Sequence, residues 1–99
     1  MSRVLPKDGI QLRAMEDVLV ERRRQDCKWG VQRHPPEWWL VILGEEYGEA
    51  CQAALADMFT KNRRTGEKRS GEYRKELVQV AAVALAAIER FDIEEGSDE

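Results

Sequence analysis

The segment from Leu77 to Ile88 limits what this chain can fold into more than any other part of it. Every residue in the segment except Gln79 is apolar. A helix that is apolar on all sides has to be covered on all sides by other protein surface. Three helices from a chain of 99 residues cannot easily provide that cover. The segment therefore predicts a helix that is partly buried against a second copy of the chain, in a shared helical bundle.

Helical periodicity, together with glycine, proline and capping residues, divides the chain into three helices. They are expected at about residues 10–28, 37–62 and 72–92. Asp8 is a plausible N-cap for the first helix, starting near residue 9 or 10, and Gly30 stops that helix. Pro36 suits the first turn of the second helix, and Ser70 is a candidate cap for the third. No segment alternates with period two, so no strand is expected.

The segments outside these helices are polar. Residues 1–8 are expected to form a loose arm, residues 61–71 a mobile cationic loop, and residues 94–99 a frayed acidic tail. The chain is therefore predicted to be a single all-α domain over residues 1–99, with its core at about 10–92. The predicted architecture is an antiparallel bundle of three main helices, completed by oligomerisation.

Charge and composition exclude several classes of protein. The net charge of −3 argues against stable nucleic-acid binding. No secretory pattern opens the chain and its apolar stretches are interrupted, so we expect a cytoplasmic protein with no membrane partner. Cys27 and Cys51 are expected to be reduced thiols. His34, the only histidine, lies between polar and proline residues and is expected to be a loop residue without chemistry.

Acidic side chains interrupt the second apolar helix. Glu45 and Glu49 are i,i+4 neighbours and Glu46 and Glu49 are i,i+3 neighbours, so their carboxylates can converge on one side. Glu76 precedes the third apolar run. Carboxylates embedded in a core-forming helix are usually paired, hydrogen-bonded or bound to a cation, so the pattern favours a metal site. A solvated acidic face is the alternative.

These residues carry a resemblance to a known family. The order Glu45-Glu46-Tyr47-Gly48-Glu49, then a basic loop, then Glu76-Leu77-Val78-Gln79, resembles the E-E-x-x-E … E-x-x-D signature of the MazG-like all-α nucleoside triphosphate pyrophosphohydrolases. The segment Arg24-Gln25-Asp26-Cys27-Lys28-Trp29-Gly30 is also similar to one that precedes the acidic motif in a MazG-like subgroup. The likeness covers roughly residues 10–92.

The resemblance implies an enzyme that uses Mg²⁺, or Mn²⁺ in its place, to hydrolyse a nucleoside triphosphate to the monophosphate and pyrophosphate. It also implies a role in clearing the nucleotide pool, and a homodimer or homotetramer. Glu46, Glu49, Glu76 and Gln79 would bind the metal, and Glu45, or Glu46 in exchanged roles, would activate water. Trp29 would stack on the base. The phosphates would be held by cationic side chains, from among Lys28, Lys61, Arg63 and Arg64.

Several alternatives remain open on sequence alone. Gln79 stands where the family signature has aspartate, so the site should hold Mg²⁺ less tightly, and Gln79 could instead be a buried hydrogen-bonding residue. The loop cations are more typical of solvated surface, and Trp38 and Trp39 of a core or interface. The competing class is a non-catalytic helical module that binds nucleotides or a partner through a degenerate metal site. A di-iron carboxylate bundle would need Glu-x-x-His pairs, which are absent from the sequence.

Overall fold

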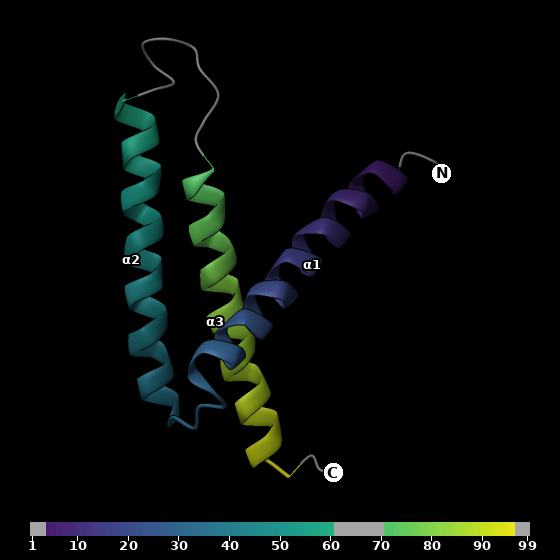
Figure 1. The fold of residues 1–99 in the computed structure, drawn as a ribbon, viewed down its shortest axis with the longest axis vertical. Coiled ribbons are helices and arrows are strands. Elements are labelled where there is room, and N and C mark those ends of the chain that lie inside the picture. Colours follow the sequence, from purple (N-terminus) through teal and green to yellow (C-terminus); the bar gives the residue numbers. More distant parts are fainter. Residues whose placement is uncertain (1–3, 61–70, 97–99) are drawn as a thin grey trace.

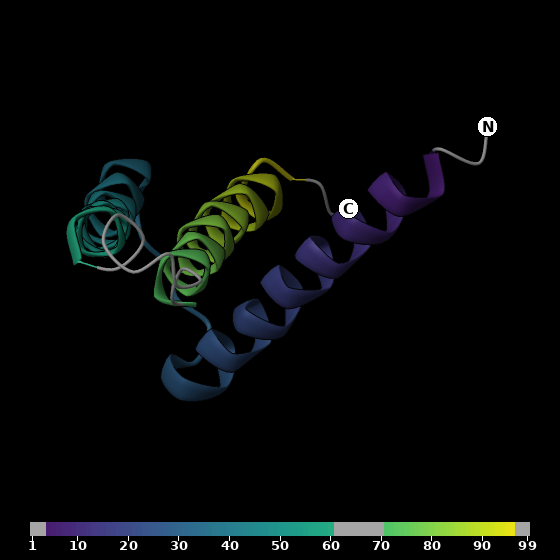
Figure 2. The same cartoon turned by 90° about the horizontal axis from the view of Figure 1, so that it is seen from above.

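Three α-helices make up the described part of the chain, residues 4–60 and 71–96 of a computed structural model. They are α1 (Val4–Trp29), α2 (Pro36–Thr60) and α3 (Glu72–Glu94). α2 and α3 lie antiparallel and side by side, whereas α1 crosses α3 obliquely and its N-terminal half projects away from both (Figure 1). The view from above shows the same arrangement (Figure 2). The all-helical prediction is confirmed, and no strand occurs in these two ranges.

The helix ends differ from expectation mainly at the start of α1. This helix begins at Val4, so the predictions of a loose arm through residue 8 and of Asp8 as a cap were wrong. Pro6 is the third residue of the helix. The first four N–H groups of a helix have no partner within it, so a proline there removes no hydrogen bond. α2 begins at Pro36 as expected.

The segment predicted to be a loop lies largely outside the described residues, as do Ser70 and residues 97–99. Gly71 occupies the position before α3 and provides no side-chain hydrogen bond to the helix. α3 continues to Glu94, two residues beyond the expected end. Its start at Glu72 agrees with the prediction.

Gly30 ends α1, as predicted. Its φ of +76° places it in the left-handed region, where a side chain costs about 1–2 kcal/mol and glycine costs little. Its N–H donates to the carbonyl of Asp26 at 2.8 Å. This is the single 5→1 hydrogen bond of the αL helix ending. The chain can then turn within residues 30–35 and start α2.

The core is small and lies between α2 and α3. Trp39, Val83 and Ala86 are its buried members, and Ile42, Leu43 and Ala87 pack against them half-buried. Trp39 thus belongs to the core, as expected. Trp38 is 51% exposed, so it does not belong to this core. No large side chain in the described ranges is completely buried, which leaves much apolar surface uncovered.

An ion pair joins the C-terminal half of α1 to α3. Nε and Nη2 of Arg22 donate to Oε1 of Glu89 at 3.1 and 2.7 Å. Nη1 of Arg22 donates to Asp26 at 2.6 Å, one turn along α1. Arg22 keeps only 15% of its side chain exposed, and partly buried ion pairs of this kind are screened less by salt than surface pairs. The pair therefore fixes where the end of α1 lies over α3.

The face of α2 that points away from α3 is an exposed apolar stripe. Its members recur at helical spacing and comprise Leu40, Val41, Gly44, Tyr47, Gly48, Cys51, Leu55 and Met58. Leu40 is 67% exposed and Tyr47 63%. A Cβ added at Gly44 or Gly48 would meet nothing within 4 Å. Glycines on a helix face let another helix approach closely, but no described part of the chain does so at Gly44 or Gly48.

None of the helices in residues 4–60 and 71–96 is long and apolar enough to cross a membrane.

Replacing Gly30 tests the helix ending. Gly30→Ala should lower the free energy of unfolding by about 1 kcal/mol, because the added Cβ is strained at positive φ even though it meets no neighbour. In a chain of this size that corresponds to a Tm lower by about 4–8 °C. Gly30→Asn is the control and should lose less, since asparagine tolerates this conformation. Equal Tm values for wild type and Gly30→Ala in a thermal melt would contradict the assignment.

Candidate metal centre

Three glutamates from two helices converge at one place. Glu46 and Glu49 lie one turn apart on α2, and Glu76 lies in the first half of α3. Each offers a carboxylate oxygen, and these oxygens all lie within 4.8 Å of one another. Glu46 and Glu76 are half-buried and Glu49 is exposed. The antiparallel packing of α2 on α3 thus brings together acids separated by almost thirty positions of sequence.

The shared location changes the titration of two of these groups. Burial of its carboxyl raises the pKa of Glu46, and the negative charges of Glu49 and Glu76 raise it further. Burial raises the pKa of Glu76 as well, and the charge of Glu49 and a hydrogen bond with it add to the effect. Both shifts mean that the charged forms are disfavoured in the fold. The cluster is therefore a place where positive charge would be stabilising.

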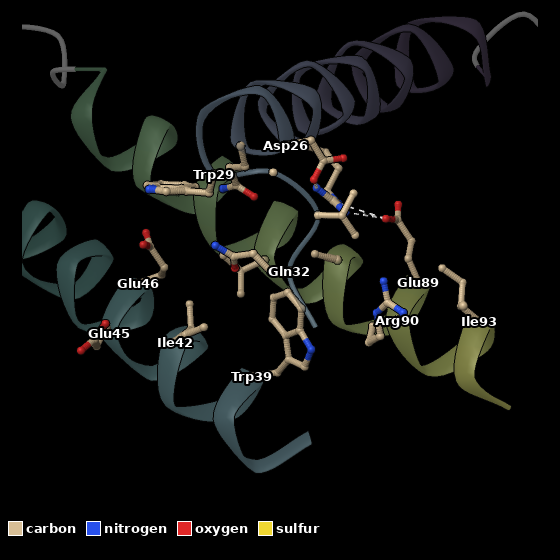
Figure 3. A pocket seen from close by; sticks show the side chains of 16 residues that line it. Asp26, Trp29, Gln32, Trp39, Ile42, Glu45, Glu46, Glu89, Arg90 and Ile93 are labelled. Atoms are coloured by element: carbon tan, nitrogen blue, oxygen red, sulfur yellow. Dashed lines mark hydrogen bonds and ion pairs between the residues drawn. The ribbon is translucent and has the colours of Figure 1, made fainter. Parts of the chain in front are cut away.

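The other predicted metal and catalytic residues lie beside the cluster. Glu45 is exposed, belongs to no described carboxylate cluster with the other three, and has its carboxylate turned away from that of Glu46 (Figure 3). Gln79 is half-buried on α3, one turn after Glu76.

A pocket of about 390 Å³ adjoins the cluster. It lies between the C-terminal end of α1, the connection over residues 30–35, α2 and α3 (Figure 3). Glu45 and Glu46 line one part of it and Trp29 another. Its size is within the range of small-molecule sites, about 300–1,000 Å³. One member of the cluster, Glu46, and an aromatic ring suited to stacking thus line the same cavity, whereas Glu49 and Glu76 do not line it.

The predicted substrate-binding residues are only partly described. Trp29 is 55% exposed and lines the pocket. The Nζ of Lys28 lies 4.7 Å from the centre of the Trp29 ring, within the range of a cation–π contact. Lys61, Arg63 and Arg64 lie outside the described residues.

Sequence reasoning missed two parts of this region. The pocket includes Arg90 and Gln32, neither of which belongs to a recognisable motif. Gln32 is hydrogen-bonded to His34 at 3.1 Å, and the His34 ring stands edge-on to Trp39 with centroids 5.0 Å apart. His34 is in the connection, as expected, and its contacts there are structural. No spacing signal in the sequence could have placed Gln32 and Arg90 at one pocket, because they belong to separate elements.

Comparisons with models of protein families, with curated proteins and with solved structures found no match for this chain.

Removing one charge from the cluster tests the mutual repulsion. A carboxyl whose pKa is raised in the fold favours folding when protonated, and this contribution is lost as pH rises from its ordinary value of 4.5 through the raised pKa. Without added metal, Glu46→Gln should therefore flatten the fall in Tm between pH 4.5 and 7. At pH 7 it should raise Tm by about 1–4 °C, from a like-charge term of about 0.2–0.5 kcal/mol.

Glu16→Gln, an exposed change on α1, is the matched control and should follow the wild-type pH profile. A Glu46→Gln profile identical to that of the wild type would show that the carboxylates do not repel one another.

Proposed function

We propose that this protein is a metal-dependent nucleoside triphosphate pyrophosphohydrolase, which releases a nucleoside monophosphate and pyrophosphate. One observation carries the proposal: three glutamate oxygens from α2 and α3 lie within 4.8 Å of one another at the edge of a pocket of about 390 Å³. The order of acidic residues that resembles the MazG-like signature supports the same activity. The role in clearing the nucleotide pool, in the cytoplasm, is part of the proposal.

The donor set fits Mg²⁺ or Mn²⁺. Mg²⁺ prefers oxygen ligands and is commonly held by one or two carboxylates together with substrate phosphates and water. Glu46, Glu49 and Glu76 offer carboxylate oxygens that lie within 4.8 Å of one another. Glu46, Glu49 and Glu76 would hold the ion, and the Gln79 amide oxygen would complete or orient this set. When bound, the ion would neutralise charge that develops on the phosphate oxygens.

The chain's own side chains would supply the remaining steps. The pocket would receive the nucleoside, with Trp29 stacked on the base. Lys28 would contact the outer phosphates from the end of α1, and Lys61, Arg63 and Arg64 remain candidates for the same role. Glu45 would accept a proton from the attacking water as the bond between the α- and β-phosphates breaks. Its exposed position beside the pocket, outside the cluster, leaves it available for this role.

Self-association through the apolar stripe of α2 is part of the proposal. Leu40, Tyr47 and Leu55 are half or more exposed on one face, and a stable monomer rarely leaves so many large apolar side chains in a row in water. Gly44 and Gly48 on the same face would let a partner helix come close, offsetting the cost of about 1 kcal/mol that each has within a helix. A dimer, or a tetramer built from it, would cover this face.

A non-catalytic nucleotide-binding module is the second candidate. Gln79 favours it, because a carboxamide in place of the signature aspartate brings no charge to the metal. The two candidates differ in turnover: both would bind nucleotide with a divalent ion, and only the enzyme would release pyrophosphate.

The test of activity is a screen of the common ribo- and deoxyribonucleoside triphosphates with Mg²⁺ or Mn²⁺. Monophosphate and pyrophosphate should appear in equal amounts from at least one of them. Glu49→Gln should lower kcat/KM by about 100-fold or more, since changes even to the partners of metal ligands cost about 10–100-fold. Nucleotide binding without turnover across the whole panel would favour the non-catalytic module.

Gln79→Asp tests whether residue 79 acts on the metal. In the proposed site the new carboxylate would reduce the Mg²⁺ concentration needed for half-maximal activity, whatever its effect on kcat. In a purely structural role it would be a partly buried charge that lowers Tm, and Mg²⁺ would not restore the loss. The measurement is a Mg²⁺ titration of Tm and of pyrophosphate release. Unchanged metal dependence would remove Gln79 from the site.

A charged substitution on the apolar stripe of α2 tests self-association. Leu55→Lys should shift the sedimentation of the protein from dimer or tetramer to monomer without unfolding it, because Leu55 is 50% exposed in the single chain. Ala56→Lys is the control: it is also exposed but points about 100° away around the helix, so assembly should persist. A wild-type protein that sediments as a monomer at micromolar concentration would contradict the proposal.

A further inference from the structure

A partly buried cation with few partners lines the end of the pocket away from Glu45 and Glu46. Arg90, on α3, keeps only 12% of its side chain exposed. Among the described residues its Nε has no hydrogen-bond partner, and its opposite charge there is Glu94, with Oε2 at 3.9 Å from Nη1. That distance is too long for a hydrogen bond. Because buried charges are normally paired and hydrogen-bonded, Arg90 has capacity for a further acceptor.

A second donor without a partner lies at the same end. Trp39 is 7% exposed, and its indole Nε1 has no hydrogen-bond partner within residues 4–60 and 71–96. Its nitrogen is on the side of the ring toward α3, where Arg90 lies (Figure 3). Buried side-chain donors are satisfied in the large majority of cases. Arg90 and Trp39 are both exceptions, and they line one pocket from two different helices. Together they point to a ligand that carries hydrogen-bond acceptors.

The ends of the pocket therefore differ in hydrogen bonding. Glu45 and Glu46 provide carboxylates at one end. Away from them, Asp26 and Glu89 are paired with Arg22, and Arg90 and Trp39 provide N–H donors. Arg90 Nε and Trp39 Nε1 are shielded from water, so an acceptor would reach them through a small rotation of the side chains. A nucleotide with its phosphates at the glutamates would direct the far edge of its base toward these donors.

We propose, on the basis of the function proposed above, that Arg90 and Trp39 determine which base is accepted. They favour a base edge with two neighbouring acceptors. The O6/N7 edge of guanine has this pattern, and arginine recognises it commonly, whereas the matching edge of adenine pairs the N7 acceptor with an amino donor. Adenine would set its amino group against the N–H donors and leave one of them unpaired.

Wild-type protein and altered bases test the pattern directly. GMP and IMP both keep O6 and N7, whereas 7-deaza-GMP lacks the N7 acceptor. In metal-free buffer GMP and IMP should raise Tm alike, and 7-deaza-GMP and AMP should raise it clearly less. With Mg²⁺, kcat/KM should be about tenfold or more higher for GTP than for ATP, which is the discrimination expected of a paired-donor contact.

Conservative variants separate the two donors from general packing. Trp39→Phe keeps an aromatic ring and removes the N–H, so the ratio of kcat/KM for GTP over ATP should fall toward one. Trp38→Phe, at an exposed neighbour that does not line the pocket, should leave the ratio unchanged. Arg90→Lys keeps the charge, loses the forked donor geometry and should also lower the ratio.

The failures of the two proposals are distinguishable. Preferential binding of GMP and IMP by a protein that hydrolyses no triphosphate would overturn the proposed hydrolysis and support the base site. Hydrolysis of triphosphates with equal kcat/KM for GTP and ATP, or a preference unchanged in Trp39→Phe, would overturn the base site and leave the hydrolysis standing.

Discussion

The close packing of α2 on α3 is the constraint on which the rest of this structure depends. Trp39 is the one buried aromatic residue in the described part of this contact, and Val83 and the small side chains of Ala50, Ala82 and Ala86 are buried as well. Small residues in a contact allow two helices to approach closely. In the register that this core sets, acids on the two helices meet. The same contact that forms the core therefore creates the carboxylate cluster.

The carboxylate cluster is formed by α2 and α3, whereas the pocket also depends on α1. Burial and mutual charge raise the pKa of Glu46 and Glu76, so the α2–α3 contact is strained electrostatically at one point. α1 contributes through the Arg22–Glu89 ion pair, which holds its C-terminal end over α3. Trp29, at that end, then lies on the pocket. A cation at the glutamates would relieve the repulsion and complete a site that all three helices form.

Sequence patterns predicted the helix boundaries well where a single residue sets the boundary. Gly30 and Pro36 marked the boundaries between α1 and α2 because a positive φ and a missing N–H act on the residue itself. The start of α1 was misjudged because Asp8 was taken as an N-cap, whereas the helix begins four residues before it. The apolar run of α3 was expected to need cover from a second chain; Ala82, Val83 and Ala86 are buried within the chain itself, whereas Leu77 at 41% and Ile88 at 57% remain exposed.

The candidate site was predictable to the extent that it follows helical spacing. Glu46 and Glu49 were placed on one side of α2 by their i,i+3 separation, and Glu76 joins them because α2 and α3 pack antiparallel. Glu45 could not be separated from Glu46 in advance, since adjacent residues both lie within reach of one helix face. Arg90 and Trp39 were not foreseen as neighbours in a pocket, because that contact depends on the register between helices.

Titration of the metal-free protein with Mn²⁺, followed through the EPR signal of the free ion, tests the central claim most directly. The claim is that Glu46, Glu49 and Glu76 together bind a divalent cation. We expect saturable binding in the absence of nucleotide. Glu49→Gln and Glu76→Gln should each raise Kd by about tenfold or more, and Glu16→Gln should not change it. Binding that is equally tight in all four proteins, or no saturable binding to the wild type, would contradict the claim.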